Sequence, residues 1–549
     1  MTAEGRVKEL LDLYGAPDAC VAALLCDAHA ADSIAFTVVE ADLSSQDVTY
    51  GSLRGQSERF AAGLTALGIG PGDTVGVLMG KSIELVVALL GIWRRGAVAV
   101  PLFTAFAPPA IALRLRGSSA KVVVVDTDQR EKLDLSNERP EPRPWRIVTA
   151  GDGGRDGDLS FSELLATDPN GAGPPVAVGG DAPFIMIFTS GTTGSPKGVP
   201  TLVRGIAHMV MYMEYGYDVR PDDVYWNATD PGWAYGFFYV IVGPMAIGQR
   251  SIMVHAGFSP DLAWRVLSHL EVTNLAAAPT AYRAMRNASP SAPVTLRCAS
   301  SAGEPLTPDL IPWAEQVLDT PIADHYGQTE LGMVVANAWH SDIRRPILPG
   351  SMGYPLPGHN VEVLLEGADE FAPAGIRGRV AIDTEAPLYA FPGYHADTER
   401  SAQCLTSDGR WYITGDSATR DNDGAFFFSS RDDDVIIMAG YRIGPFEIES
   451  VLVEHPDVAE AAVVGVPDAL RGEVVEAFVL LRPGVTASEA LTMELQQLVR
   501  NRFAKHAYPR SVHYIDALPK TPSGKVQRFA LRDSRRSEVT AMGAQQPES

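Results

Sequence analysis

Short apolar runs alternate along the chain with segments of helical period. Residues 74–79, 98–102 and 121–125 are rich in strand-forming side chains, and residues 81–93 (KSIELVVALLGIW) form an apolar-rich segment of helical period. This alternation is typical of βαβ units on a mainly parallel sheet. The sequence therefore predicts an α/β fold in which residues 81–93 are a buried scaffold helix.

Other stretches break this pattern. Residues 151–158 and 168–183 are rich in Gly, Pro and Asp, which predicts loops inside a domain. Residues 360–384 show strand-like alternation with Gly and Pro turns and predict a smaller β subdomain. The chain of 549 residues is longer than a single core usually supports, so we expect at least two domains.

Composition and charge exclude several classes of protein. The chain is 46% hydrophobic and 20% charged, as in ordinary globular proteins, and its net charge of −22 argues against a nucleic-acid partner. Four scattered cysteines, Cys20, Cys26, Cys298 and Cys404, suggest neither disulfides nor a zinc site. The N-terminus lacks an apolar signal core, so we expect a cytoplasmic protein without membrane insertion. The sequence leaves open whether the protein forms a homo-oligomer.

One loop combines glycines, hydroxyl groups and a lysine. Residues 189–198 read TSGTTGSPKG and follow the apolar run 184–188. Free backbone N–H groups, hydroxyl donors and one ammonium are what a phosphate group needs. The loop is not a Walker A motif, because Lys197 follows Pro196 and precedes Gly198. Taken alone, such a loop is more often a flexible surface turn.

The same loop resembles the phosphate loop of the adenylate-forming superfamily, which includes acyl-CoA synthetases, nonribosomal adenylation domains and firefly-type luciferases. Further matching segments follow in the family's order: SAGEPL (301–306), DHYGQTE (324–330), WYITGD (411–416), SRDDDVIIMAGYRIGPFEIE (430–449) and LPKTPSGKVQR (518–528). With VTYGSL and GAVAVPL earlier in the chain, the resemblance extends from about residue 48 to about residue 533. The residues of these motifs are most similar to those of medium-chain acyl-CoA synthetases.

The resemblance implies a specific organisation. The large N-terminal domain, residues 1–432, would contain two βαβ-type subdomains and a small β-barrel subdomain. Residues 433–549 would form a small, mobile α+β domain, with the hinge at Asp433.

Adenylation requires donors and cations around the α-phosphate, because a carboxylate attacks it while pyrophosphate leaves. The resemblance gives Thr329 as a hydroxyl donor to that phosphate and Glu330 as the carboxylate ligand of Mg²⁺. Without the resemblance, a Thr-Glu pair would indicate a helix cap. Mg²⁺ and ATP are therefore the expected cofactor and co-substrate.

The nucleotide-binding residues are also implied by the resemblance. Asp416 would accept the ribose hydroxyls, and Tyr326 would stack on the adenine, although an Asp in a turn and a buried tyrosine are the ordinary alternatives. Arg431 and Arg442 would contact phosphate or hydroxyl groups, or else be surface charges. The full set is Thr189, Ser190, Gly191, Thr192, Thr193, Gly194, Lys197, Gly303, Glu304, Pro305, Asp324, His325, Tyr326, Gly327, Gln328, Thr329, Asp416, Arg431, Arg442 and Lys525.

Lys525, in PSGKVQR, is the expected adenylation lysine of the small domain. A Pro-Ser-Gly turn can present an ammonium that stabilises charge on the α-phosphate, whereas an isolated lysine would merely be solvated. After rotation about Asp433, the face with Ala439, Gly440 and Tyr441 would receive coenzyme A. The form Pro-x-x-x-x-Gly-Lys also resembles sites of reversible acetylation, so a lysine acetyltransferase and deacetylase are candidate partners.

The sequence specifies the carboxylic acid substrate less well than the nucleotide site. The segment DPGWAYGFFY (230–239) matches the acyl-pocket region, with Trp233 and Tyr235 as candidate walls, although core aromatics are the alternative. Acetyl-CoA synthetases have a tryptophan where this chain has Gly327, so we expect more room here and a medium-chain, branched or aromatic acid.

These features predict an AMP-forming acid–thiol ligase. A stand-alone adenylation enzyme that loads a carrier protein, a luciferase-type oxygenase and a non-catalytic acyl or nucleotide sensor are the alternatives. A sensor would not need an adenylation lysine, so the joint presence of Lys525 and the phosphate-binding residues counts against it.

Overall fold

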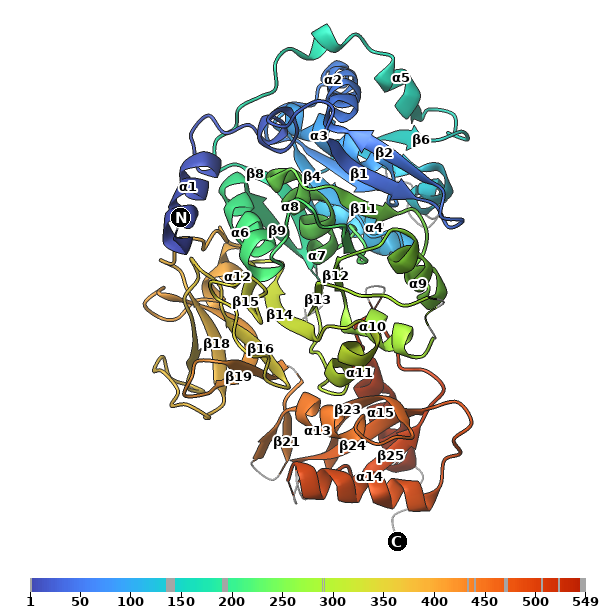
Figure 1. Ribbon diagram of the computed structural model, residues 1–549, viewed down its shortest axis with the longest axis vertical. Helices are drawn as coiled ribbons and strands as arrows, with labels where there is room; N and C mark the ends of the chain where they lie inside the picture. Colours follow the sequence, from blue (N-terminus) through green and yellow to red (C-terminus); the bar gives the residue numbers. More distant parts are fainter. Residues whose placement is uncertain are drawn as a thin grey trace.

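The computed structural model describes residues 2–134, 144–189, 196–288, 290, 292–431, 434–438, 441–468, 472–504, 507–521 and 524–543, without the side chains of residues 441, 442, 472 and 536–543. It contains a seven-stranded, a thirteen-stranded and a five-stranded sheet among these residues. Figure 1 shows the first two in the upper and middle parts of the molecule and the third in a smaller unit at the C-terminal end. The predicted α/β class is confirmed.

The seven-stranded sheet has the strand order β7-β6-β5-β3-β4-β8-β9. All of its pairings are parallel except β8 with β9. Its strands are β3 (Thr74–Leu78), β4 (Val98–Pro101), β5 (Val122–Asp126), β6 (Arg146–Ala150), β7 (Leu159–Ser160), β8 (Pro183–Thr189) and β9 (Lys197–Leu202). Helices α2 (Tyr50–Ala66), α3 (Ile83–Arg94), α4 (Pro108–Gly117) and α5 (Phe161–Leu165) lie between or beside them. The predicted strands and crossovers are confirmed.

Helix α3 is the predicted scaffold helix. It begins after Ser82, whose hydroxyl accepts a hydrogen bond from the Leu85 N–H at 3.1 Å, and its residues from Leu85 to Arg94 are buried. Trp93 donates from its indole N–H to the Phe184 carbonyl at 3.0 Å. This bond fixes β8, which leads into the glycine-rich loop.

The thirteen-stranded sheet combines a parallel and an antiparallel part. Its order is β17-β18-β19-β20-β16-β15-β14-β13-β12-β10-β11-β1-β2. The strands of the parallel part are β1 (Ile34–Val39), β10 (Tyr225–Asn227), β11 (Ser251–Val254), β12 (Asn274–Ala277), β13 (Cys298–Ala302) and β14 (Ile322–Gln328), with β2 (Ser45–Thr49) antiparallel at the edge. The helices of this region are α1 (Ala3–Tyr14), α6 (Ile206–Met211), α7 (Ala234–Gly236), α8 (Gly243–Ile247), α9 (Pro260–His269), α10 (Pro279–Arg286) and α11 (Leu310–Val317).

The predicted β subdomain is an antiparallel continuation of this sheet. It consists of β15 (Gly332–Ala336), β16 (Ser351–Pro355), β17 (Val361–Leu364), β18 (Gly378–Asp383), β19 (Trp411–Arg420) and β20 (Phe426–Arg431), with helix α12 (Thr398–Gln403). The chain reverses between β14 and β15, so the hydrogen bonding runs without a break from the parallel strands into the antiparallel ones. The strands are present as expected, and they continue the parallel sheet.

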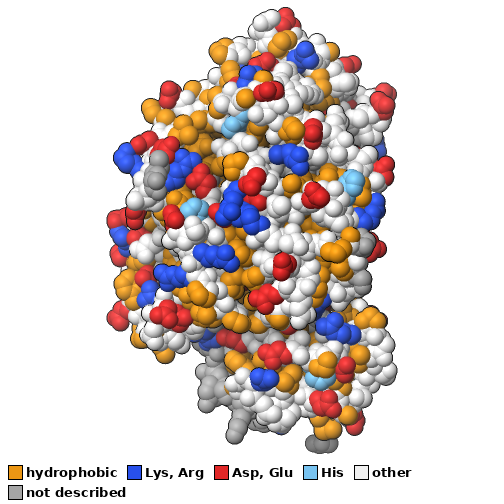
Figure 2. All heavy atoms as spheres, in the orientation of Figure 1, with side chains coloured by type: hydrophobic (Ala, Val, Ile, Leu, Met, Phe, Trp, Pro, Cys, Tyr) orange, Lys and Arg blue, Asp and Glu red, His pale blue; other side chains and the backbone are white. Residues whose placement is uncertain are grey.

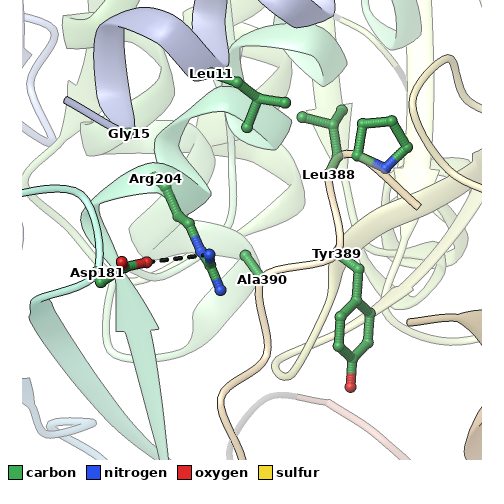
Figure 3. Close-up of a pocket in the computed structure, with 8 residues that line it drawn as sticks. Leu11, Gly15, Asp181, Arg204, Leu388, Tyr389 and Ala390 are labelled. Atoms are coloured by element: carbon green, nitrogen blue, oxygen red, sulfur yellow. Dashed lines mark ion pairs between the residues drawn. The ribbon is translucent and has the colours of Figure 1, made fainter. Parts of the chain in front are cut away.

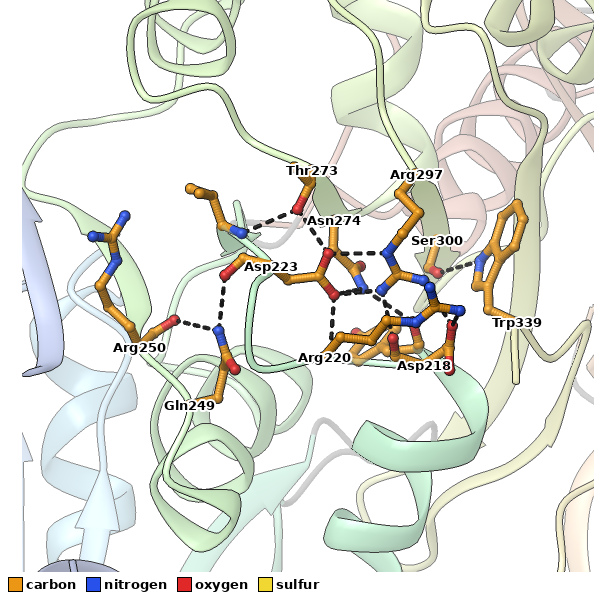
Figure 4. A network of polar contacts seen from close by, with 12 residues as sticks. Asp218, Arg220, Asp223, Gln249, Arg250, Thr273, Asn274, Arg297, Ser300 and Trp339 are labelled. Atoms are coloured by element: carbon orange, nitrogen blue, oxygen red, sulfur yellow. Dashed lines mark hydrogen bonds and ion pairs between the residues drawn. The ribbon is translucent and has the colours of Figure 1, made fainter. Parts of the chain in front are cut away.

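A polar network holds the amino ends of the central parallel strands (Figure 4). Arg297 precedes β13 and donates to Asp218 Oδ2 at 2.7 Å and to Asp223 Oδ1 at 3.0 Å. Thr273 precedes β12 and donates to the same Asp223 oxygen at 2.7 Å. Only 3% of the Asp223 side chain is exposed, so Arg297 supplies the counter-charge that this buried carboxylate needs.

The small domain has its own sheet and core. Its strands are β21 (Ile436–Met438), β22 (Tyr441–Ile443), β23 (Val458–Asp468), β24 (Gly472–Leu481) and β25 (Ser511–Tyr514), and its helices are α13 (Pro445–Leu452), α14 (Glu489–Arg502) and α15 (Arg528–Gly543). Strand β20 ends at Arg431 and belongs to the large domain's sheet, whereas β21 belongs to this one. The exact boundary at Asp433 lies outside the described residues and stays a prediction.

Arg528, at the start of α15, ties the small domain together. It donates to Glu449 Oε1 at 2.9 Å and Oε2 at 2.6 Å, and its guanidinium lies 3.5 Å from Asp434 Oδ2. Arg532 pairs with the other Asp434 oxygen at 2.6 Å. The first described residue after the predicted hinge is thereby fixed to the segment that follows Lys525.

Charged side chains of both signs cover the face of the molecule that Figure 2 shows. Figure 2 shows Lys and Arg side chains interspersed with Asp and Glu over both domains. Of the helices in the described part of the chain, none has the length and apolar character that a bilayer-spanning helix requires.

Candidate active site

The predicted site residues gather where strands of the thirteen-stranded sheet end. Strand β13 runs into Gly303 and Glu304, and β14 carries Asp324 through Gln328 and then Thr329 and Glu330. The two strands are parallel, with Ala302 opposite His325, so both sets lie at the same carboxyl edge. Ligands of α/β sheets bind at this edge.

Asp416 is the centre of a set of hydrogen-bond donors. Its Oδ2 accepts from the Tyr326 hydroxyl at 2.7 Å and from Gln328 Nε2 at 2.6 Å, and Arg431 Nη1 lies 3.4 Å from Oδ1. Asp416 and Arg431 are register partners in the β19–β20 pair. Burial raises the pKa of the Asp416 carboxyl, and Arg431 acts in the opposite direction. The sequence motifs that contain these four residues are therefore brought together.

Glu304 faces helix α10. Its Oε1 accepts from the Thr280 N–H at 2.7 Å and from Arg283 Nη2 at 3.0 Å, and the Thr280 hydroxyl donates to the same oxygen. Its neighbour Gly303 has φ +98°, and a Cβ there would lie 2.9 Å from Cη2 of Trp233. Gly303 is thus required by its backbone conformation and by the closeness of the indole.

Asp324 and His325 are almost fully buried, and their surroundings differ. Asp324 Oδ2 accepts from the Leu306 N–H at 3.2 Å, while Oδ1 is buried without a partner, and burial raises the pKa of this carboxyl well above its usual range. His325 Nδ1 lies 2.7 Å from the Tyr212 hydroxyl and Nε2 lies 3.2 Å from the Asn337 carbonyl. Burial lowers the pKa of His325 to about 3, so the ring is neutral and packs in the core. Any nucleotide contact of His325 would have to come from its backbone.

Lys197 and Glu330 meet at Tyr394. Strand β9 begins at Lys197, which is opposite Thr189 in β8, on either side of the glycine-rich loop. The Tyr394 hydroxyl donates to Glu330 Oε1 at 3.0 Å, and Lys197 Nζ donates to this hydroxyl at 3.5 Å. Burial raises the pKa of the Glu330 carboxyl. Thr329 lies beside Glu330 in a small recess that His208 and Ala390 also line.

Lys525 enters the site from the small domain. The Thr280 hydroxyl oxygen lies 3.4 Å from the Gly524 carbonyl oxygen, and Lys525 Nζ lies 5.7 Å from the centre of the Trp233 ring. Part of the Lys525 side chain contacts solvent, yet the surrounding protein lowers the pKa of its ammonium by desolvation, and Arg431 adds to this. Three acids act in the opposite direction: Glu304, Asp416 and Glu330. The ammonium therefore lies in the field of residues from four motifs, namely Glu304, Glu330, Asp416 and Arg431.

The predicted acyl-pocket residues form an aromatic group. The Trp233 and Tyr235 rings are 5.7 Å apart, and the Tyr235 hydroxyl accepts a hydrogen bond from Tyr217 at 2.5 Å. A Cβ at Gly327 would lie 2.1 Å from the Gly332 carbonyl oxygen and 2.7 Å from Met333 Cα. The room expected beside Gly327 is thus occupied by the backbone of β15, because Gly327 pairs with Met333. Whether Gly327 borders the acyl pocket stays a prediction.

Several predicted residues lie outside the described part of the chain. They are Ser190, Gly191, Thr192, Thr193 and Gly194 of the glycine-rich loop, Asp433 of the hinge, and Ala439 and Gly440 of the coenzyme A face. Tyr441 and Arg442 belong to β22, but their side chains are not described. Pro305 lies in the segment that follows β13.

Thr280 and Tyr394 were missed by the sequence analysis. Both lie in segments without a recognisable motif, and each contacts site residues far away in the sequence. An aromatic residue after Pro-Gly in the segment FPGYH would have been the one available signal for Tyr394.

A separate cavity of about 330 Å³ lies beneath helix α1 (Figure 3). Leu11 and Gly15, Arg204, and residues 387–390 line it, with Arg204 paired to Asp181 at 3.0 Å. It shares Ala390 with the recess beside Glu330 but contains none of the predicted site residues.

Two known family models match the chain. Residues 26–395 match the AMP-binding enzyme family and residues 447–525 match the AMP-binding enzyme C-terminal domain. The chain is 34% identical over 493 residues to the acetyl-coenzyme A synthetase of Bacillus subtilis, covering 88% of this chain and 84% of that protein. It is 35% identical over 481 residues to the mitochondrial acyl-coenzyme A synthetase ACSM4 of Rattus norvegicus, covering 85% and 80%.

Solved structures give the same result. An acyl-CoA synthetase from Brucella canis is 40% identical, with a TM-score of 0.75 and coverage of 98% of this chain and 99% of that one. A benzoate CoA ligase from Burkholderia xenovorans is 28% identical, with a TM-score of 0.81 and coverage of 94% and 100%. The resemblance inferred from the motifs is confirmed: the chain belongs to the AMP-binding enzyme family and is an acid–thiol ligase of the acyl-CoA synthetase type.

Proposed function

We propose that this protein activates a compact branched or aromatic carboxylic acid with ATP, releases pyrophosphate, and transfers the acyl group from the adenylate to coenzyme A with release of AMP. The observation that carries this proposal is the docking of the Gly524–Lys525 turn on Thr280. It puts a small-domain ammonium into the field of Glu304, Asp416 and Glu330. An ammonium in that position would stabilise the charge that develops on the α-phosphate during adenylation.

The surroundings fit a nucleotide. The Asp416 carboxylate would accept ribose hydroxyls in exchange for part of its present hydrogen bonding to Tyr326 and Gln328. The unpartnered buried Oδ1 of Asp324 would accept the exocyclic amine of adenine, since such an atom favours a ligand that supplies the missing hydrogen bond. Lys197 would contact the phosphates at the end of the glycine-rich loop.

The residues also fit Mg²⁺. Within the described residues, no group of three or more His, Cys, Asp or Glu side chains forms a metal cage. Mg²⁺ in nucleotide sites needs only one or two protein carboxylates, because phosphate oxygens and water complete its shell. Glu330 would supply that carboxylate and Thr329 a donor to the α-phosphate, and the bound ion would neutralise charge on the phosphates.

The aromatic residues beside Lys525 favour a compact acid. Trp233 contacts the site at both Gly303 and Lys525, and Tyr235 behind it is 4% exposed and hydrogen-bonded to Tyr217. An extended chain would have to displace these rings, whereas a short branched or flat aromatic group can lie against them. Of the acids that the sequence allows, we therefore prefer branched and aromatic ones to long unbranched ones.

The second half-reaction would follow a rotation of the small domain that withdraws Lys525. The solvent contact of the Lys525 side chain is compatible with its reversible acetylation, which would remove the ammonium and stop adenylation. Mutation in solution tests the hinge role of Asp433 and the coenzyme A contacts of residues 439–441.

The decisive experiment measures AMP, pyrophosphate and acyl-CoA from ATP, Mg²⁺ and coenzyme A with acetate, butyrate, hexanoate, octanoate, isobutyrate, benzoate and phenylacetate. We expect acyl-CoA and AMP in equal amounts, with the highest kcat/KM for isobutyrate, benzoate or phenylacetate. Pyrophosphate exchange without acyl-CoA formation would indicate that a carrier protein, rather than coenzyme A, accepts the acyl group. No reaction with any acid would overturn the proposal.

A further inference from the structure

Tyr394 stands between the two charged side chains assigned to the metal and the phosphates. Its hydroxyl donates to Glu330 Oε1 at 3.0 Å and accepts from Lys197 Nζ at 3.5 Å. The same ammonium lies 4.5 Å from the centre of the Tyr394 ring, within the range of a cation–π contact. One phenol therefore contacts the lysine of the glycine-rich loop and the carboxylate that follows β14.

The segment around Tyr394 is held on several sides. Its N–H donates to the Ser401 hydroxyl at 2.8 Å, and the N–H of His395 donates to the Gly198 carbonyl at 2.8 Å, directly after Lys197. The ring packs on Phe391 with centroids 5.1 Å apart, and Tyr394 is 7% exposed. These contacts fix the position of the hydroxyl relative to both charged groups.

Within the part of the chain that the structure describes, Lys197 and Glu330 meet through Tyr394 and form no ion pair of their own. A direct ion pair would cancel the charge that each group needs for a ligand. A neutral phenol orients the carboxylate by a hydrogen bond and the ammonium by its ring, and it cancels neither charge. Both groups then stay available to a ligand that combines a cation with phosphate oxygens.

We propose that Tyr394 is a positioning residue that keeps Lys197 and Glu330 apart and directs both toward one metal–triphosphate ligand. The inference rests on the function proposed above, because it concerns the same nucleotide site. Removal of the hydroxyl would free the Glu330 carboxylate and let the Lys197 ammonium approach it. The metal would then have to compete with an ion pair.

The test measures metal binding apart from turnover. Mn²⁺ is titrated into wild-type protein and Tyr394→Phe in the presence of a non-hydrolysable ATP analogue, and free Mn²⁺ is followed by electron paramagnetic resonance. Tyr389→Phe is the matched control, since it removes a phenol from the same segment but lines the separate cavity. A hydrogen bond to a charged group predicts about a tenfold weaker Mn²⁺ affinity in Tyr394→Phe, and no change in Tyr389→Phe.

A double-mutant cycle with Glu330→Gln separates positioning from a general loss of structure. If Tyr394 acts through the carboxylate, Tyr394→Phe has no further effect on Mn²⁺ affinity in the Glu330→Gln background. Equal Mn²⁺ affinities of wild type and Tyr394→Phe, or additive losses of affinity in the cycle, would overturn the inference. The proposed function would still stand if the wild type forms adenylate. Absence of acid-dependent pyrophosphate exchange in the wild type would instead overturn the proposed function.

Discussion

The Thr280 hydroxyl oxygen of the large domain lies 3.4 Å from the Gly524 carbonyl oxygen of the small domain. Thr280 is bonded to Glu304, the acid that follows β13. The turn that carries Lys525 is therefore attached to the end of a strand that borders the site. In the proposed cycle, this arrangement would correspond to the adenylation state.

Replacement of Lys525 by alanine is expected to abolish adenylate formation, because the ammonium that we propose to stabilise the α-phosphate would be lost. Thioester formation from a supplied acyl-adenylate should be retained. Pyrophosphate exchange measures the first step and acyl-CoA release from synthetic adenylate measures the second. Lys520→Ala is the control, since Lys520 pairs with Glu460 at 2.6 Å in the same segment. Equal loss of both steps in Lys525→Ala would remove the lysine from its assigned role.

Substitution of Asp416 by asparagine should weaken ATP binding. The carboxylate accepts from Tyr326 and Gln328 and faces Arg431, so an amide would lose the charge that attracts ribose hydroxyl donors. We expect the KM for ATP to rise about ten- to a hundredfold, from the usual strength of hydrogen bonds to charged groups. The control Asp383→Asn removes another buried carboxylate, one that pairs with Arg410. An unchanged KM for ATP in Asp416→Asn would contradict the assignment.

The contacts around Asp416 follow from the sequence more directly than those of Tyr394 and His325. Tyr326, Gln328, Asp416 and Arg431 all come from motifs, and strand register alone brings Asp416 opposite Arg431. Tyr394 was not predictable in this way, because its position depends on a loop folding back 64 residues onto Glu330. Likewise, a motif does not show which way each side chain of β14 points: His325 proved to face Tyr212 in the core.

Truncation of Trp233 to alanine should broaden the range of acids. The indole contacts the space beside Gly303 and Lys525, so its loss opens room for longer chains and removes a wall for compact ones. We expect the ratio of kcat/KM for octanoate to that for isobutyrate to rise about tenfold, the scale of one to two buried methylenes. Trp313→Ala, which alters the Trp264–Trp313 pair elsewhere, should leave the ratio unchanged. An unaltered profile in Trp233→Ala would place the acyl group in a different part of the site. A tryptophan at residue 327 would not test the acyl pocket in this way, since its side chain would collide with β15.

The small domain should lose stability in acid through Glu476. Burial alone would raise the pKa of this carboxyl, but hydrogen bonds from His513 and Arg535 outweigh burial and lower it to about 2. A lowered folded pKa stabilises the fold above the unfolded value of about 4.5, and this contribution is lost as pH falls toward 2.

Unfolding by guanidinium at pH 6 and pH 3 should show the effect. The difference in unfolding free energy between wild type and Glu476→Gln is expected to be up to about 3 kcal/mol at pH 6 and smaller at pH 3. The exposed Glu489→Gln should show no such trend. A difference independent of pH would mean that packing rather than charge is lost.

The bonds of Arg528 and Arg532 to Asp434 would give the proposed catalytic cycle its order. They couple the first described residue after the predicted hinge to the segment beyond Lys525, so a rotation at that hinge would move both as one rigid body. A rotation that exposes a new face to the site would then withdraw the lysine in the same movement. The two half-reactions would be mutually exclusive because of this rigid connection, without any signal passing between separate sites.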